Sequence, residues 1–140
     1  TADGRAVALN SSGSKLWAFS AKGRHNAIAV GDVTGDGVPE IALACEDTHL
    51  YVLDGRGKLV WQFKCPRYAK RGGKYGEARA VHVADVDADG KSEVIVGANN
   101  MQLPVLGPGG RERFAYRSSD SKVTFDNLFT FDADGDGRLE

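Results

Sequence analysis

Short segments in which apolar residues alternate with small residues recur along the chain, and they predict β-strands. In residues 27–31, Ile28 and Val30 fall on one side of an extended chain and small residues fall on the other, which is the period of two that marks a strand. Residues 41–44 and 94–97 are apolar throughout, as expected for strands buried on both faces. The sequence lacks the i, i+3, i+4 apolar spacing of a helix, so we predict an all-β chain.

Two motifs recur in the same order along the sequence, with a common period. Acidic loops begin at Asp32, Asp85 and Asp132, which are 53 and 47 residues apart. A glycine-containing hairpin with an aromatic residue near its end accompanies them in residues 6–19, 50–63 and 103–116. Because two independent motifs share one period, we interpret the chain as a tandem repeat.

Each repeat unit is expected to contain four strands, named a to d in chain order. Strand a is predicted at 27–31, 80–84 and 127–131, strand b at 41–44 and 94–97, strand c at 50–53, and strand d at 59–63. The small residues of strand a predict close approach to a neighbouring backbone. Four antiparallel strands in about 50 residues match the size of a β-propeller blade.

The chain is therefore predicted to be a partial β-propeller of about three blades. Residues 1–20 supply strands c and d of one blade, 26–64 and 79–117 are full blades, and 126–140 start a further blade, which makes eleven strands. A closed propeller needs about four to eight blades. We expect the remaining blades to come from a parent chain or, alternatively, from a second copy of this chain.

The acidic loops have the residue types of a calcium site. Oxygen ligands can come from positions 1, 3 and 5, glycine at position 6 allows the tight turn, position 7 offers a backbone carbonyl, and glutamate at position 9 closes the site. The candidate ligands for Ca²⁺ are Asp32, Thr34, Asp36, Val38 and Glu40; Asp85, Asp87, Asp89, Lys91 and Glu93; and Asp132, Asp134, Asp136, Arg138 and Glu140.

The acidic loops admit two other interpretations. An EF-hand needs glutamate at position 12 and flanking helices, whereas position 12 is Leu43 or Val96 and the flanks are predicted strands. A polar turn without metal also favours Asp and Gly, but three loops with glutamate at position 9 favour calcium. The number of carboxylates and the rigidity of each loop predict the order of calcium affinity: the loop at Asp85 is tightest, the loop at Asp32 is next and the loop at Asp132 is weakest.

The acidic loop followed by the hairpin Leu-Asp-x-x-Gly-x-x-x-Trp-x-Phe of residues 53–63 resembles VCBS and FG-GAP repeats, the integrin-α-like propellers. The Phe-Gly and Gly-Ala-Pro signatures of FG-GAP repeats are absent, which favours the VCBS-like label. The resemblance implies a calcium-stabilised binding or adhesion module of a larger protein. Its alternative implication is the propeller portion of a rhamnogalacturonan-type polysaccharide lyase. The binding module is favoured because no catalytic set is visible.

Charge and composition limit the binding partners and the cellular location that the sequence predicts. The net charge of −1 gives no basic field for nucleic acid, and no apolar run is long enough for a membrane span. Calcium loops of this type indicate an extracellular, periplasmic or cell-surface setting. A basic, aromatic segment could bind an acidic glycan or a protein ligand, although a solvated loop is the simpler interpretation; its candidate residues are Arg67, Tyr68, Lys70, Arg71, Lys74 and Tyr75.

One histidine and the two cysteines are further candidates for a chemical role. His82 lies on a predicted strand a, where a lone histidine is more often structural than catalytic. Cys45 and Cys65 end strands b and d of one blade. Two strand spacings separate them by about 10 Å, too far for a disulfide, so free thiols are expected.

Overall fold

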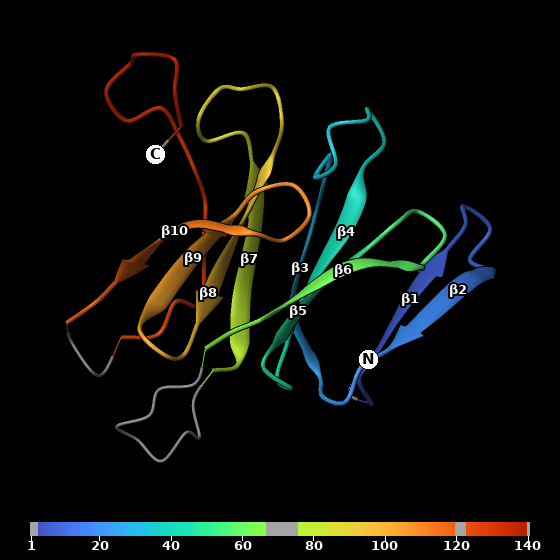
Figure 1. Ribbon diagram of the computed structural model, residues 1–140. Helices are drawn as coiled ribbons and strands as arrows, with labels where there is room; N and C mark the ends of the chain where they lie inside the picture. The colour runs from blue at the N-terminus through green and yellow to red at the C-terminus, as the bar shows by residue number, and fades with distance from the viewer. Residues whose placement is uncertain (1–2, 67–75, 120–122, 140) are drawn as a thin grey trace.

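The computed structural model describes residues 3–66, 76–119 and 123–139 (Figure 1). In this part of the chain the regular structure is β-strand, which confirms the all-β prediction. The strands are β1 (Arg5–Leu9), β2 (Lys15–Ser20), β3 (His25–Gly31), β4 (Glu40–Cys45), β5 (His49–Leu53), β6 (Leu59–Lys64), β7 (Ala78–Ala84), β8 (Glu93–Ala98), β9 (Gln102–Leu106) and β10 (Glu112–Arg117).

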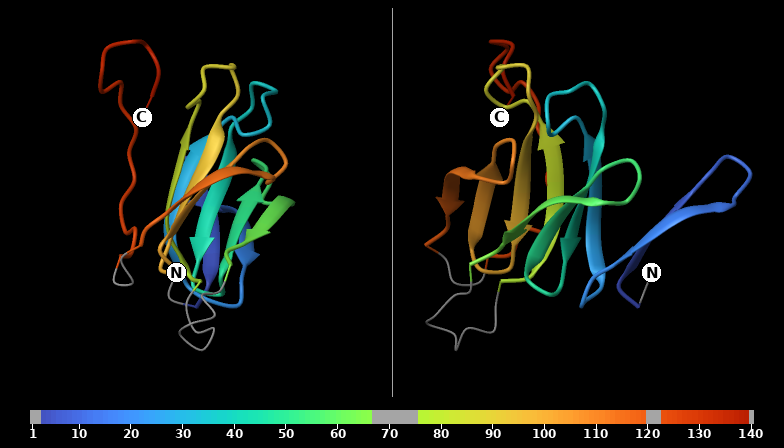
Figure 2. Two further views of the ribbon diagram at one scale, coloured as in Figure 1. Left: turned by 60° about the vertical axis from the view of Figure 1, so that its left-hand side comes forward. Right: turned by 45° about the vertical axis from the view of Figure 1, so that its right-hand side comes forward.

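These strands form one hairpin and two four-stranded antiparallel sheets. The hairpin is β1–β2, and the sheets have the orders β3-β4-β5-β6 and β7-β8-β9-β10. Each sheet follows the chain from strand a to strand d, as predicted for a propeller blade. We call them blade 1 and blade 2. The hairpin, which the sequence predicts to be the last two strands of a further blade, lies beside blade 1 (Figures 1 and 2).

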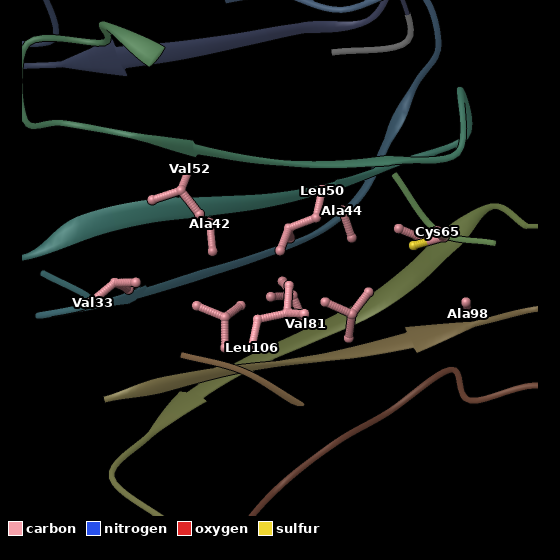
Figure 3. Packing of buried hydrophobic residues seen from close by; sticks show 12 residues of the cluster. Val33, Ala42, Ala44, Leu50, Val52, Cys65, Val81, Ala98 and Leu106 are labelled. Atoms are coloured by element: carbon pink, nitrogen blue, oxygen red, sulfur yellow. The ribbon is translucent and has the colours of Figure 1, made fainter. Parts of the chain in front are cut away.

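The core lies between the two blades (Figure 3). Blade 1 contributes apolar side chains from β4 and β5, and blade 2 contributes them from β7, β8 and β9: Ala42, Ala44, Leu50 and Val52 on one side, and Val81, Val94, Val96 and Leu106 on the other. Every one of these side chains is buried. Burial of apolar surface between sheets, at about 25 cal/mol per Å², is therefore what holds neighbouring blades together.

Strand a brings the two blades closest. β3 and β7 lie side by side, and a Cβ atom on Gly31 would lie 2.5 Å from Val83 Cγ1. The two strands do approach closely here, but the group that faces Gly31 is the Val83 side chain and not the neighbouring backbone that the sequence predicted. On the opposite side of β3, Ile28 and Val30 are exposed. Ile28 lines a groove of about 640 Å³ between blade 1 and the hairpin, where it meets Val7 and Trp17.

Tryptophans from two hairpins, β1–β2 and β5–β6, each pack on the glycine turn of the following blade. A Cβ atom on Gly57 would lie 2.5 Å from Trp17, and one on Gly110 would lie 2.6 Å from Trp61. Both glycines have left-handed backbones, with φ of 78° and 79°. Trp17 Nε1 also donates a hydrogen bond to the Gly55 carbonyl at 3.0 Å. The repeated hairpin motif is thus a contact between blades.

The prediction of a strand at residues 127–131 is wrong, because the described residues after β10 have no regular structure. The described residues therefore form ten strands, where the sequence predicted eleven. A β-ladder needs a neighbouring strand, and this segment has no ladder with any strand among the described residues. The segment still contacts blade 2, through Arg79 Nε to Asp126 Oδ1 at 2.6 Å and His82 Nε2 to Thr130 Oγ1 at 3.1 Å. These two contacts place the segment against β7.

Both cysteines are free and buried, in agreement with the strand-spacing argument. Burial raises the pKa of the Cys45 thiol to about 11 and that of Cys65 to about 12. Desolvation disfavours the charged thiolate, so both side chains act as apolar packing groups. In the described part of the chain, no helix has the length and apolar character that a membrane crossing requires.

The tryptophan–glycine contact predicts different costs for two neighbouring substitutions. Gly109→Ala and Gly110→Ala both place a side chain at positive φ, which costs about 1–2 kcal/mol. Only Gly110→Ala also drives a methyl group into Trp61, because Gly109 faces open space. We expect Gly110→Ala to lose about 1–3 kcal/mol more in urea unfolding. Equal losses would contradict the proposed contact between blades.

Candidate metal centre

Three acidic loops follow the three a-type segments, and all lie at one end of the molecule (Figures 1 and 2). The first follows β3, the second follows β7, and the third follows the segment at 123–131. The first two loops touch, because a Cβ atom on Gly35 would lie 3.0 Å from Lys91 Cγ. The packing of neighbouring blades therefore sets the spacing of these two loops.

The aspartate at position 1 organises each loop. Asp32 Oδ1 accepts hydrogen bonds from Gly35 N at 2.7 Å and Asp36 N at 3.1 Å, and its Oδ2 accepts one from Gly37 N at 2.8 Å. Asp132 repeats all three hydrogen bonds in its own loop, and Asp85 repeats the two from positions 5 and 6. The glycine at position 6 has φ of 83°, 85° and 86° in the three loops, a conformation that favours glycine.

The carboxylates of positions 1, 3 and 5 converge in the second and third loops. One oxygen from each of Asp85, Asp87 and Asp89 lies within 4.8 Å of the others, and Asp132, Asp134 and Asp136 form a second such group. The first loop has Thr34 at position 3 and therefore offers fewer carboxylates. All of these donors are hard oxygen atoms, which is the ligand type that Ca²⁺ requires. The donor sets fit the predicted ion.

Positions 7 and 9 are held by the loop itself. The backbone N–H of position 7 donates to the aspartate at position 5, through Val38 to Asp36, Lys91 to Asp89 and Arg138 to Asp136. At position 9, buried Glu40 accepts hydrogen bonds from Val33 N and Thr34 N, each 3.0 Å from Oε2. Glu93 is fully buried and accepts from Val86 N at 3.2 Å. Glu140 lies outside the described residues.

Sequence reasoning missed this structural role of the glutamate. A carboxylate placed directly before a buried strand b must satisfy its own charge, and backbone N–H groups of the loop are the nearest donors. The glutamate thereby connects the end of the loop to its beginning without a bound ion. The adjacent apolar run, 41–44 in blade 1, was the available signal.

Sequence reasoning also missed Arg113, which reaches into the second loop from β10. Its Nη2 lies 2.5 Å from Asp87 Oδ2 and its Nη1 lies 2.6 Å from Glu93 Oε1. The hydrogen bond with Glu93 raises the pKa of the Arg113 guanidinium further above its ordinary value. No arginine is expected from the repeat, since Val60 stands at the matching position of blade 1.

The remaining candidates do not join this centre. Arg67, Tyr68, Lys70, Arg71, Lys74 and Tyr75 lie outside the described residues. His82 is partly buried between β7 and the following segment, where its ring faces the Thr130 hydroxyl. That contact fits the structural interpretation of this histidine.

Comparison with known proteins supports the fold that these contacts define. Residues 1–69 match the family described as the lambda-carrageenase beta-propeller domain. No curated protein matches the chain. Its structure is similar to that of BamB from Moraxella catarrhalis, with 19% identity, a TM-score of 0.57, and coverage of 84% of this chain and 31% of that one.

Two further solved structures share the architecture. BBS1N in complex with ARL6DN is 19% identical with a TM-score of 0.59, and the match covers 84% of this chain and 32% of that one. The Pan2 WD40 domain of Neurospora crassa is 13% identical with a TM-score of 0.55, covering 82% and 31%. The chain thus spans about a third of each of these structures. It is an all-β chain with the blade architecture of a β-propeller.

The position-9 glutamate gives a prediction that needs no metal. Glu40→Ala removes the acceptor for Val33 N and Thr34 N, and a buried unsatisfied donor costs about 1–3 kcal/mol. Glu40→Gln keeps a side-chain oxygen in place. In chelator, we expect Glu40→Ala to lower the free energy of unfolding by about 2–4 kcal/mol and Glu40→Gln by less than half as much. Equal losses would show that the hydrogen bonds do not matter.

Proposed function

We propose that the chain is part of a calcium-stabilised β-propeller that serves as a binding or adhesion module of a larger protein. The observation that carries this proposal is the convergence of three carboxylates in each of the loops at Asp85 and Asp132. Like charges this close repel one another, and a bound cation would offset the repulsion.

The loop residues have distinct parts in this function. Asp32, Asp85 and Asp132 hold the loop backbone and would also face the ion, together with the oxygens at positions 3 and 5. Calcium, when bound, would neutralise the carboxylates and fix the loop between strand a and strand b. Glu40 and Glu93 support the loop through their backbone hydrogen bonds. Each site would therefore stabilise its own blade.

We further propose an extracellular, periplasmic or cell-surface location for the protein. Extracellular calcium-binding modules generally have dissociation constants of about 10⁻⁴–10⁻³ M. Such sites fill only where calcium is abundant. Most of the loop residues here are exposed, which supports weak, extracellular-type binding.

The proposed ligand is an acidic glycan or, alternatively, a protein. The match of residues 1–69 to a λ-carrageenase domain, whose name denotes an enzyme acting on a polysaccharide, supports the glycan. The same match favours a second candidate function, the propeller portion of a polysaccharide-degrading enzyme. The complex of BBS1N with ARL6DN is the support for a protein ligand.

Calcium should stabilise the protein against heat. At 10 mM Ca²⁺, a site with the affinity given above contributes about 1.4–2.7 kcal/mol. We expect the wild type to melt at a higher temperature in calcium than in chelator, and Asp32→Asn and Asp132→Asn each to reduce the difference. Asp54→Asn is the matched control, because Asp54 also accepts backbone hydrogen bonds in a turn but lies outside the loops. Coinciding melts with and without calcium would refute calcium stabilisation.

The two candidate functions differ in whether polysaccharide is cleaved. We expect the full protein to be retained on immobilised λ-carrageenan or a uronic-acid polysaccharide, and not on a neutral gel, without releasing products. Growth of unsaturated-product absorbance or of reducing ends would instead establish the degrading enzyme. Equal passage through the charged and neutral gels would argue against an acidic glycan as the ligand.

A further inference from the structure

The second loop contains a built-in cation that the first loop lacks. The Arg113 guanidinium bridges Asp87 at position 3 and Glu93 at position 9, with contacts of 2.5 Å and 2.6 Å. The Glu93 side chain is fully buried, while the side chains of Arg113 and Asp87 are each 38% exposed. A carboxylate as deeply buried as Glu93 requires a charged or hydrogen-bonded partner, and Arg113 supplies one.

A β-bulge directs Arg113 toward the loop. In the pairing of β10 with β9, the register shifts between Glu112 and Phe114, which leaves Arg113 as the extra residue. Bulges commonly redirect a side chain in this way. Arg113 lies on β10, at one edge of the sheet, and contacts the loop that joins β7 to β8 in the same blade.

The same bulge occurs in the other hairpins with apolar residues. The register shift in β6 isolates Val60, and that in β2 isolates Leu16. Both side chains are largely exposed, at 44% and 61%. A bulge therefore does not itself require arginine, and the arginine needs another explanation.

The explanation lies at position 3 of the loops. Blade 1 has Thr34 there and Val60 at its bulge, whereas blade 2 has Asp87 and Arg113. The added carboxylate and the added guanidinium are in direct contact. The first loop, residues 32–40, has a formal charge of −3. The second loop, residues 85–93, has four carboxylates and Lys91, and with Arg113 its formal charge is −2.

We propose that Arg113 is an internal counter-ion for the second loop, which closes this loop without metal and competes with calcium for Asp87 and Glu93. The proposal rests on the proposed calcium function and concerns its regulation. It removes the charge advantage that ranked the loop at Asp85 first, and it places the loop at Asp32 above it in calcium affinity. The second loop therefore stabilises blade 2 without a metal ion, and calcium adds little to its stability.

The test is a calorimetric calcium titration of the full chain with and without the arginine. Arg113→Met keeps much of the aliphatic length and removes the charge, and Arg111→Met is the control on the same turn. Binding by the loop is obtained as the difference between each protein and its Asp85→Asn variant. Loss of a positive charge within a few ångströms should raise the association constant of this loop roughly tenfold, and Arg111→Met should leave it within about twofold.

A second measurement is made in chelator, where calcium has no part. Thermal unfolding of Arg113→Met, Asp87→Asn and the double variant forms a double-mutant cycle. We expect Arg113→Met to lower the melting temperature and Asp87→Asn to restore part of the loss in the double variant. Additive effects would overturn the internal counter-ion, as would an unchanged or weaker affinity of the Asp85 loop in Arg113→Met.

The outcomes separate this proposal from the calcium function on which it rests. If calcium binds and Asp32→Asn and Asp132→Asn reduce binding while Arg113→Met changes nothing, the arginine proposal alone fails. If no loop binds calcium in any variant, the calcium function fails and competition by Arg113 fails with it. Should Arg113→Met not fold, Arg113→Met with Asp87→Asn, which restores the net charge, is titrated against Asp87→Asn alone, and removal of the arginine should still raise the affinity of the loop because Arg113 also contacts Glu93.

Discussion

Close packing between neighbouring blades at strand a is the constraint on which the other features depend. β3 and β7 approach so closely that a methyl group on Gly31 would meet Val83. The apolar faces of β4 and β5 can then meet those of β7 and β8 and bury a common core. Because each blade is covered by the next, a single four-stranded sheet is not a folding unit by itself, as in other repeat architectures. The segment at 123–131 continues the series by lying beside β7 without being a strand.

The acidic loops depend on this packing because they connect strand a, at the blade interface, to strand b within the same blade. Their backbones are already organised by position-1 aspartates and position-9 glutamates. A metal would therefore add to a loop whose hydrogen bonds are in place, and less conformational entropy would be lost on binding. Blade 2 goes further, since Arg113 adds an ion pair that includes a fully buried carboxylate. Repeats with one sequence pattern can thus differ in how much they depend on an ion.

The hairpin motif shows a similar division between local and long-range causes. The glycine turns adopt left-handed backbones for local reasons, and Gly57 and Gly110 share nearly the same φ. Each turn also packs against a tryptophan from the preceding hairpin: Gly57 lies against Trp17, and Gly110 lies against Trp61. The aromatic residue therefore does not stabilise its own hairpin alone, and it couples the hairpin to its neighbour.

The sequence by itself determined the strands, the repeat and the position of the acidic loops. These follow from the period-two alternation at Ile28 and Val30, from the spacing of Asp32, Asp85 and Asp132, and from glycines where the backbone is left-handed. All three are local properties of the chain. Only the tertiary structure decided that residues 127–131 lack a ladder, that Glu40 bonds to its own loop, and that Arg113 enters the loop at Asp85. Each of these depends on which segments become neighbours, and Arg113 in particular is 28 residues from Asp85 and reaches the loop only because β10 bulges within the folded blade.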